Sequence, residues 1–454
     1  MVSSLSEAVS VHLQDEYRQR RERVMAKMPT STAIFRSAPL AVMHRDVEHP
    51  FRQESDFFYL TGFNEPEAVA VLAPHHEEHR FILFVQPKEW EKEVWSGYRV
   101  GVEDAKAVYG ADEAYPIGEL EEKLPQYLAK ADRLYYHFGI DETFNQTLLK
   151  QWQSLLRQYP KKGFGPTALE DPMTLLHPLR LVKSETELEL MRKAIAISVE
   201  AHHLAWDMAK PGIYEYEIQA EMERLFRRRG GVGPAYPSIV ASGPNACVLH
   251  YIENSRALEA GDLLLIDAGC SYGYYNGDIT RTYPVGGKYG MEQRVIYEIV
   301  LEAQRQAIAQ IKPGNPFSAV HDTAVQVLVE GMIELGFLVG EPEELIKENK
   351  YKPYYMHRTS HWLGLDVHDV GAYKQNEEES QLLQPGQVLT VEPGMYIAPL
   401  VKPAEEQPEV PPQWRGIGVR IEDDVLVTAT GCEVLTAGIP KMPEELEGHY
   451  SASR

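Results

Sequence analysis

The stretch GDLLLIDAGCSYGYYNGDITRT, residues 261–282, ends an apolar run with one acid and then adds a second. Asp267 closes the run, and Asp278 follows eleven residues later with three glycines between the two acids. A carboxylate at the end of a buried strand loses hydration unless a cation or hydrogen-bond donors replace the water. The glycines indicate a long-looped hairpin that brings both carboxylates to one face of two paired strands. The stretch therefore predicts a polar site.

A second stretch has the same spacing. In GQVLTVEPG, residues 386–394, Glu392 comes six residues after the first glycine and two before the last, as Asp267 does in GDLLLIDAG. A further strand-like segment, GVRIEDDVLV, carries Glu422 in the place that corresponds to Asp278. The two halves thus predict two matched pairs of acids.

The helices that precede these strands are also repeated. Both halves show the order helix, Lys-Pro-Gly, helix, glycine, with the tripeptides at 210–212 and 312–314. A capping box formed by Ser184 and Glu187 opens the first helix, and the last of the four is expected over 317–335. The repetition predicts a duplicated ααββ unit in which a pseudo-two-fold axis relates the halves.

Four carboxylates near one axis would raise one another's pKa unless cations neutralise them. Two divalent cations balance the charge and leave room for one bridging hydroxide. His357, His361 and His368 offer a nitrogen ligand, and His361 is preferred because Gly364 allows a close backbone approach. Oxygen donors with one imidazole favour Mn²⁺, Fe²⁺ or Co²⁺. The pattern predicts a two-metal hydrolytic centre.

Each of these residues also has a plainer interpretation. Asp267 could be a turn residue, Glu392 a strand end at the surface, and His361 a buried histidine bonded to a carbonyl oxygen. The matched positions in the two halves favour the metal centre.

Four motifs closely resemble the metallopeptidase family with the pita-bread fold, and within it the aminopeptidase P group. They are DAGCSYGYYNGDITRTYPV, HRTSHWLGLDVHDVG, LTVEPGMYI and GIGVRIEDDVLVT. The stretch FRQESDFFYLTGFNEPEAVAVL, residues 51–72, resembles the first domain of that group. One departure is the loop AYKQNEEESQLLQ, residues 372–384, which is acidic where the family pattern carries arginine.

The resemblance implies a metalloaminopeptidase that removes an N-terminal residue followed by proline, with a hydroxide held between two metal ions, Mn²⁺ in bacterial members. Asp278 and Glu422 would bridge the ions. The implied metal ligands are Asp267, Asp278, His361, Glu392 and Glu422. The implied catalytic residues are Glu392, His250, His357, His368 and Arg420. Two alternatives remain open: an Xaa-Pro dipeptidase (prolidase) with the same ligands, and a metal-free peptide-binding module.

The fold class is expected to be α+β, with a smaller α/β N-terminal domain over residues 1–177 and a pita-bread catalytic domain over 178–454. The first domain is predicted from strand-like runs at 68–74, 80–87 and 133–140 and a helix at 145–158, followed by a linker at 159–173. Residues 9–25 predict an exposed amphipathic helix.

Composition limits the partners and the compartment. A net charge of −22, from 45 basic and 67 acidic side chains, disfavours nucleic acid and anionic membranes. The three scattered cysteines indicate a reducing cytoplasm, and we expect neither a signal peptide nor a membrane span. The expected partners are peptides with proline in second position and further copies of the chain, as a homodimer or homotetramer.

Overall fold

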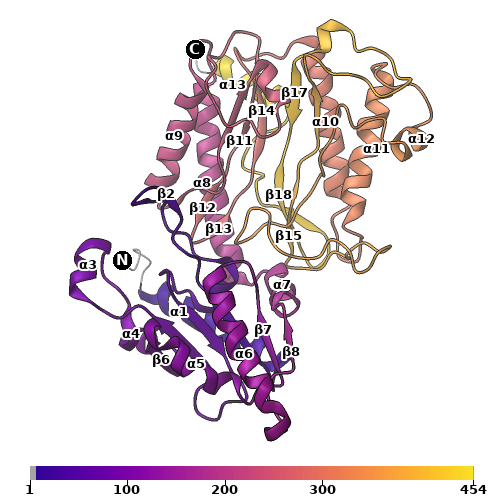
Figure 1. The fold of residues 1–454 in the computed structure, drawn as a ribbon. Helices are drawn as coiled ribbons and strands as arrows, with labels where there is room; N and C mark the ends of the chain where they lie inside the picture. Colours follow the sequence, from indigo (N-terminus) through magenta and orange to yellow (C-terminus); the bar gives the residue numbers. More distant parts are fainter. Residues whose placement is uncertain (1–6, 453–454) are drawn as a thin grey trace. The chain divides into compact units, whose positions relative to one another are not determined.

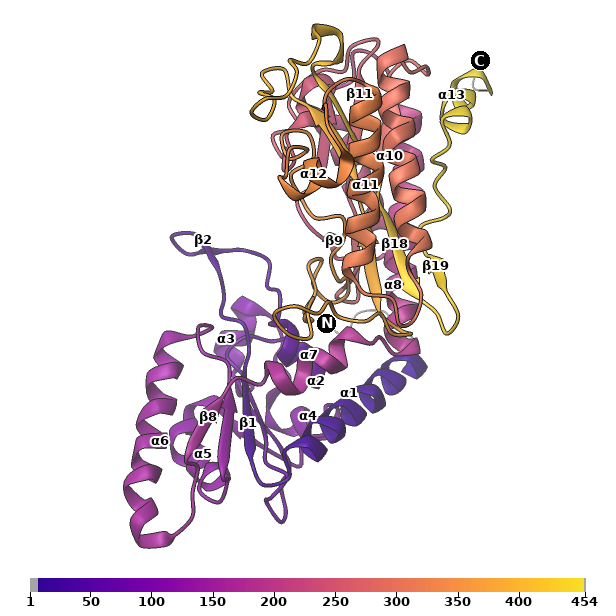
Figure 2. The ribbon, with the colours of Figure 1, turned by 90° about the vertical axis from the view of Figure 1, so that its right-hand side faces the viewer.

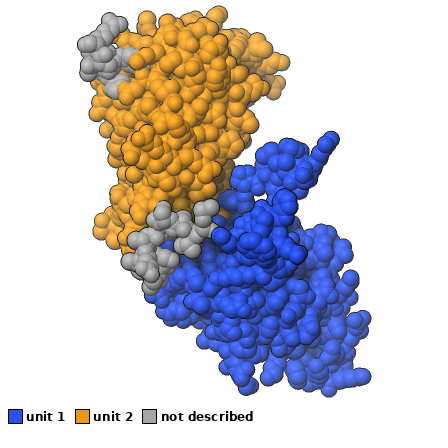
Figure 3. Space-filling model, turned by 90° about the vertical axis from the view of Figure 1, so that its left-hand side faces the viewer, with its two compact units in different colours: residues 1–180 blue, residues 181–454 orange. Residues whose placement is uncertain are grey.

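The computed structural model describes residues 7–452. The chain divides into two compact units, residues 1–180 and 181–454, which Figure 3 colours separately. Among the described helices, none combines the length and apolar character that crossing a bilayer requires.

The first unit is built around a six-stranded mixed sheet with the strand order β6-β5-β4-β1-β7-β8. Its strands are β1 (Thr32–Arg36), β4 (Val69–Leu72), β5 (Phe81–Val85), β6 (Glu113–Pro116), β7 (Arg133–Tyr136) and β8 (Ala168–Glu170), and a separate hairpin consists of β2 (Val42–His44) and β3 (Val47–Glu48). Its helices are α1 (Glu7–Lys27), α2 (Ser55–Thr61), α3 (Trp90–Ser96), α4 (Gly101–Ala107), α5 (Leu120–Leu128), α6 (Glu142–Lys162) and α7 (Met173–Leu181). The predicted α/β class of this unit is confirmed.

The expectation of an exposed first helix is wrong. The helix exists as α1, but Tyr17, Val24 and Met25 are all buried. The Tyr17 ring meets Phe58 of α2 edge to face, with 6.0 Å between ring centroids. Apolar periodicity identifies the stripe of a helix, but it does not reveal which neighbouring element covers that stripe.

The second unit contains the predicted four helices in two packed pairs, α8 with α9 and α10 with α11. Figures 1 and 2 show the paired helices running beside the strands of this unit. The helices are α8 (Glu185–Met208), α9 (Glu215–Arg228), α10 (Met291–Ala309) and α11 (Ser318–Glu334), with shorter α12 (Pro342–Lys347) and α13 (Pro443–Ala452). Ser184 caps α8 as predicted, since its hydroxyl accepts a hydrogen bond from the Glu187 backbone N–H.

The strands of this unit repeat one pairing scheme. In the first half β11 (Leu263–Asp267) pairs with β14 (Thr280–Pro284), and β12 (Cys270–Tyr272) pairs with β13 (Tyr275–Asn276). In the second half β15 (Val388–Val391) pairs with β18 (Asp423–Val427), and β16 (Gly394–Ile397) with β17 (Ile417–Arg420). Every one of these pairs is antiparallel, with β9 (Gly233–Pro234), β10 (Ile239–Ser242) and β19 (Cys432–Val434) at sheet edges. The predicted ααββ duplication, and with it the α+β pita-bread class, is confirmed.

The two halves share one apolar core, which fixes the strands that carry the acids. Met222 of α9, Leu264 of β11, Val300 of α10, Leu328 of α11 and Val419 of β17 are each fully buried in it. Burying such side chains contributes about 1.5–3 kcal/mol each. The strands are therefore held rigidly from both helix pairs.

Candidate metal centre

The four predicted acids lie where strands break or begin. Asp267 is the last residue of β11, and Asp278 comes just before β14. Glu392 falls between β15 and β16, and Glu422 between β17 and β18. Gly269, two residues after Asp267, is required by close approach, because a Cβ there would lie 1.7 Å from the carbonyl oxygen of Gly277.

Backbone hydrogen bonds join the two halves at the acids. The Glu422 N–H donates to the Thr280 carbonyl oxygen at 3.0 Å, and the Asp278 N–H donates to the Asp424 carboxylate at 3.0 Å. Each half therefore positions an acid of the other, so the four carboxylates converge only when both halves are folded.

The structure brings the five predicted ligands together. Ligand atoms of Asp278, His361 and Glu422 all lie within 4.8 Å of one another. His361 Nε2 is 3.4 Å from Asp278 Oδ2 and 3.6 Å from Glu392 Oε1. Asp267 is linked to Asp278 through the Tyr236 hydroxyl, which lies 2.6 Å from one carboxylate and 2.5 Å from the other.

The orientation of His361 suits a ligand. Its Nδ1 lies 3.0 Å from the Trp362 carbonyl oxygen, an acceptor, so the Nδ1–H donates there. A histidine ligand in proteins commonly fixes its ring in this way, which leaves the other nitrogen for the metal. Nε2 is therefore the nitrogen directed at the carboxylates.

The electrostatics of the cluster call for cations. Burial raises the pKa of Glu422 well above its ordinary value and that of Glu392 to about 7, with neighbouring carboxylates adding to both effects. Burial also raises the pKa of Asp267, although Arg420 opposes it. Burial alone would lower the pKa of His361, but Asp278 and Glu392 raise it to about 9. Four oxygen-donor side chains and one imidazole fit divalent cations, which would compensate this excess of buried negative charge.

The cluster lies at the wall of a cavity of about 890 Å³. The predicted substrate histidines His250, His357 and His368 also line it. The His368 ring lies 4.4 Å from the His361 ring, centroid to centroid. Within residues 7–452 no hydrogen-bond partner is recorded for the rings of His250 and His368, and both residues are exposed. Their nitrogens are thus open to a bound molecule.

Arg420 and His357 form a buried polar chain beside the acids. Arg420 donates to Asp267 at 2.6 Å and to the Tyr396 hydroxyl at 3.0 Å. His357 Nδ1 donates to the Arg358 carbonyl oxygen at 2.8 Å, so Nε2 accepts from Tyr396 at 2.8 Å. Burial, with the positive charge of Arg420, lowers the pKa of His357 to about 3.

Sequence reasoning missed three residues that support the acids, Tyr236, Thr280 and Tyr396. The Thr280 hydroxyl donates to Glu422 at 2.6 Å and accepts from Arg420 at 3.2 Å. Thr280 comes two residues after an acid, so strand alternation could have identified it. Tyr236 lies far from any motif, and the sequence gives no signal for it.

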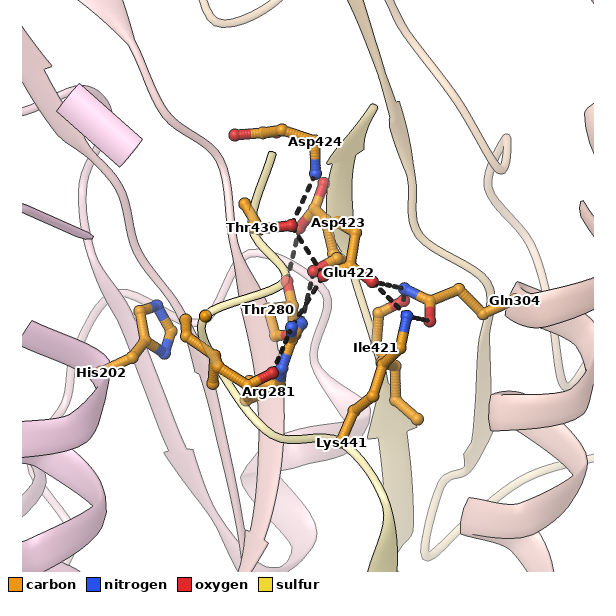
Figure 4. A network of polar contacts seen from close by, with 12 residues as sticks. His202, Thr280, Arg281, Gln304, Ile421, Glu422, Asp423, Asp424, Thr436 and Lys441 are labelled. Atoms are coloured by element: carbon orange, nitrogen blue, oxygen red, sulfur yellow. Dashed lines mark hydrogen bonds and ion pairs between the residues drawn. The ribbon is translucent and has the colours of Figure 1, made fainter. Parts of the chain in front are cut away.

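Behind the acids lies a buried network, drawn in Figure 4, that ties the two halves together. Arg281 of the first half and Asp423 of the second pair at 2.7 Å, and both side chains are fully buried. Asp423 also accepts from Thr436 at 2.7 Å and from Lys441. The network fixes the β17–β18 junction that carries Glu422.

The fold and the convergent acids define a metallopeptidase of the duplicated ααββ type, and the comparisons agree. The model for metallopeptidase family M24 matches residues 189–429, and that for the aminopeptidase P N-terminal domain matches residues 17–136. The chain belongs to metallopeptidase family M24.

Similar proteins narrow this class further. The Xaa-Pro aminopeptidase of Escherichia coli is 42% identical over 97% of this chain and 98% of its own length. The structure of Pseudomonas aeruginosa aminopeptidase PepP is 46% identical, with a TM-score of 0.91 over 97% of this chain and 98% of that chain. Zinc-substituted E. coli aminopeptidase P in complex with product has a TM-score of 0.91, with 42% identity over 97% of this chain and 99% of that one.

Proposed function

We propose that this protein is an Xaa-Pro aminopeptidase, which hydrolyses the bond between an N-terminal residue and a following proline. The convergence of four carboxylates and one imidazole at the wall of a large cavity is the observation that carries the proposal. Similarity to the E. coli enzyme over nearly its whole length favours this activity over that of an Xaa-Pro dipeptidase.

Two divalent cations would be held by Asp267, Asp278, His361, Glu392 and Glu422. The mixed donor set, dominated by oxygen, suits Mn²⁺, Fe²⁺ or Co²⁺, and of these we propose Mn²⁺. When bound, the two ions supply an activated water and compensate negative charge in the transition state.

The chain's own residues would bind the peptide and move the proton. Glu392 would accept a proton at a carboxylate oxygen and pass it to the proline nitrogen of the leaving peptide. His250 and His368 would donate hydrogen bonds to the oxygen of the scissile carbonyl, where charge develops. His357 would orient the Tyr396 hydroxyl through its Nε2, while Arg420 keeps Asp267 in position.

A substrate with proline in second position differs from other peptides at the nitrogen of the scissile bond. The nitrogen of an Xaa-Pro bond carries no hydrogen, so the site needs no acceptor for an N–H there. The free amine of the first residue would be held by one of the carboxylates, which restricts cleavage to the N-terminus.

We also propose a domain division at 177/178, a cytoplasmic location and assembly into a homodimer or homotetramer. Cys247, Cys270 and Cys432 are all free thiols, which suits a reducing compartment.

The activity can be tested with Mn²⁺-loaded protein, Ala-Pro-Ala-Ala and the dipeptide Gly-Pro. We expect the tetrapeptide to release alanine and Pro-Ala-Ala. Turnover of Gly-Pro alone would indicate a dipeptidase. A protein that retains no metal after loading and cleaves neither peptide would indicate a binding module.

A further inference from the structure

One histidine in the cavity wall takes no part in the metal centre or in the proposed mechanism. His321 lies in the first turn of α11 and lines the same cavity as the acids. Its recorded hydrogen bonds go to Thr359, which lies two residues before His361.

The bonds to Thr359 determine which ring nitrogen of His321 carries the proton. The Thr359 backbone N–H can only donate, and it lies 3.3 Å from His321 Nδ1, so Nδ1 accepts. The Thr359 hydroxyl is 2.8 Å from the same nitrogen. A neutral imidazole that accepts at Nδ1 carries its hydrogen on Nε2.

The surroundings keep His321 neutral. Burial lowers the pKa of His321 to about 4, and the positive charges of Arg358 and Lys352 act in the same direction. The ring is therefore a fixed donor at neutral pH.

The Nε2–H of His321 has no recorded hydrogen-bond partner in the described part of the chain, and it is not sealed from solvent. The neighbouring Arg358 also lines the cavity. An unused donor on the wall of a substrate cavity suits an acceptor on the substrate, because leaving it dry and unpaired would cost free energy.

We propose that the Nε2–H of His321 binds a main-chain carbonyl oxygen of the leaving peptide, beyond the proline. This inference rests on the proposed function. An aminopeptidase accommodates one residue on the amine side of the scissile bond, so the rest of a peptide must extend along the cavity away from the acids. His321 lines that cavity, and its hydrogen bonds go to Thr359 rather than to any of the five proposed ligands.

The test compares two substrates of Mn²⁺-loaded enzyme, Ala-Pro-Ala-Ala and alanyl-proline anilide, by liquid chromatography. The anilide has no carbonyl beyond the proline. His321→Asn keeps an acceptor for the Thr359 N–H, but its shorter side chain places no donor at the Nε2 position, whereas His321→Gln keeps a donor near that position. We expect His321→Asn to lower kcat/KM about three- to tenfold for the tetrapeptide, through KM, with little change for the anilide.

His321→Gln should retain the tetrapeptide preference of the wild type. His321→Ala removes the donor altogether, and metal content and thermal unfolding verify folding. Equal effects on both substrates, or no effect on either, would overturn the inference. A wild type that cleaves neither substrate would instead refute the proposed function.

Discussion

The two halves of the second unit solve the same structural problem with different side chains. In both, one acid stands at the end of a strand and a second acid comes just before the returning strand. In both, a buried polar residue eight positions before Lys-Pro-Gly bonds to strand backbone beside the acids, His202 in α8 and Gln304 in α10. Both are drawn in Figure 4. The duplication thus keeps the positions of the acids and of the buried polar helix residue, although the residue types at these positions differ.

The halves differ in what each adds. Of the five proposed ligands, the one nitrogen donor, His361, comes from the second half. The buried ion pair of Arg281 and Asp423 also occurs once, because the repeat-equivalent positions, Val425 and Ile279, are buried and apolar. The duplicated fold therefore supplies the carboxylates in pairs. His361 and the Arg281–Asp423 ion pair each occur in one copy and make the site asymmetric.

The largest expected effect comes from removing either of two equivalent acids, Asp278 or Glu422. Asp278→Ala and Glu422→Ala should each lower turnover by at least about 1,000-fold, because each removes a carboxylate proposed to hold the catalytic cations. Peptide cleavage and metal content by mass spectrometry measure the effect. Glu377→Gln, in the acidic loop, is the control. Full activity of either alanine variant in rigorously metal-free buffer would contradict the claim that both acids hold the catalytic cations.

The next effect concerns the ion pair that joins the halves. Arg281→Met should lower the free energy of unfolding by about 3–5 kcal/mol, because it leaves Asp423 buried with less compensation. Urea denaturation provides the measurement. The double variant Arg281→Met/Asp423→Leu should recover part of the loss; a double variant less stable than either single one would contradict this explanation.

A smaller effect distinguishes the two helix positions. Gln304→Leu removes donors to the carbonyl oxygens of Val391 and Ile421 and to the Asp423 carboxylate, whereas His202→Leu removes one to Ala268. We expect losses of about 2–3 kcal/mol and about 1 kcal/mol respectively. The opposite order in urea denaturation would show that the hydrogen bonds do not set the difference.

The smallest effect is the contribution of one first-half residue, His202, to the pH dependence of stability. Burial, together with Arg281, lowers the pKa of His202 to about 3, so the folded state binds fewer protons than the unfolded state below pH about 6.5. Stability should therefore fall as pH falls, by about 1 kcal/mol between pH 7 and pH 5.5. His202→Gln, which makes this position match Gln304, should remove about 1 kcal/mol from the change in the free energy of unfolding between pH 7 and pH 5.5. If the free energy of unfolding of this variant depends on pH as strongly as that of the wild type, His202 is not the source of the acid sensitivity.

The sequence predicted the duplication and the acids because the order of the segments, and the glycine spacing around Asp267 and Glu392, recur even where residue types and loop lengths change. It could not predict Tyr236 or His321, which reach the site from distant segments through tertiary packing. The prediction that α1 is exposed was wrong for the same reason, because tertiary packing decides what covers its apolar side. Thr280 lay within reach of strand alternation, but its bond to Glu422 crosses between the halves and needed the structure.

The central claim is that acids from both halves hold one pair of divalent cations. Anomalous diffraction from crystals of the Mn²⁺-loaded protein tests it most directly. We predict two manganese peaks among Asp267, Asp278, His361, Glu392 and Glu422. Peaks confined to other parts of the molecule, or none at these side chains, would contradict the account.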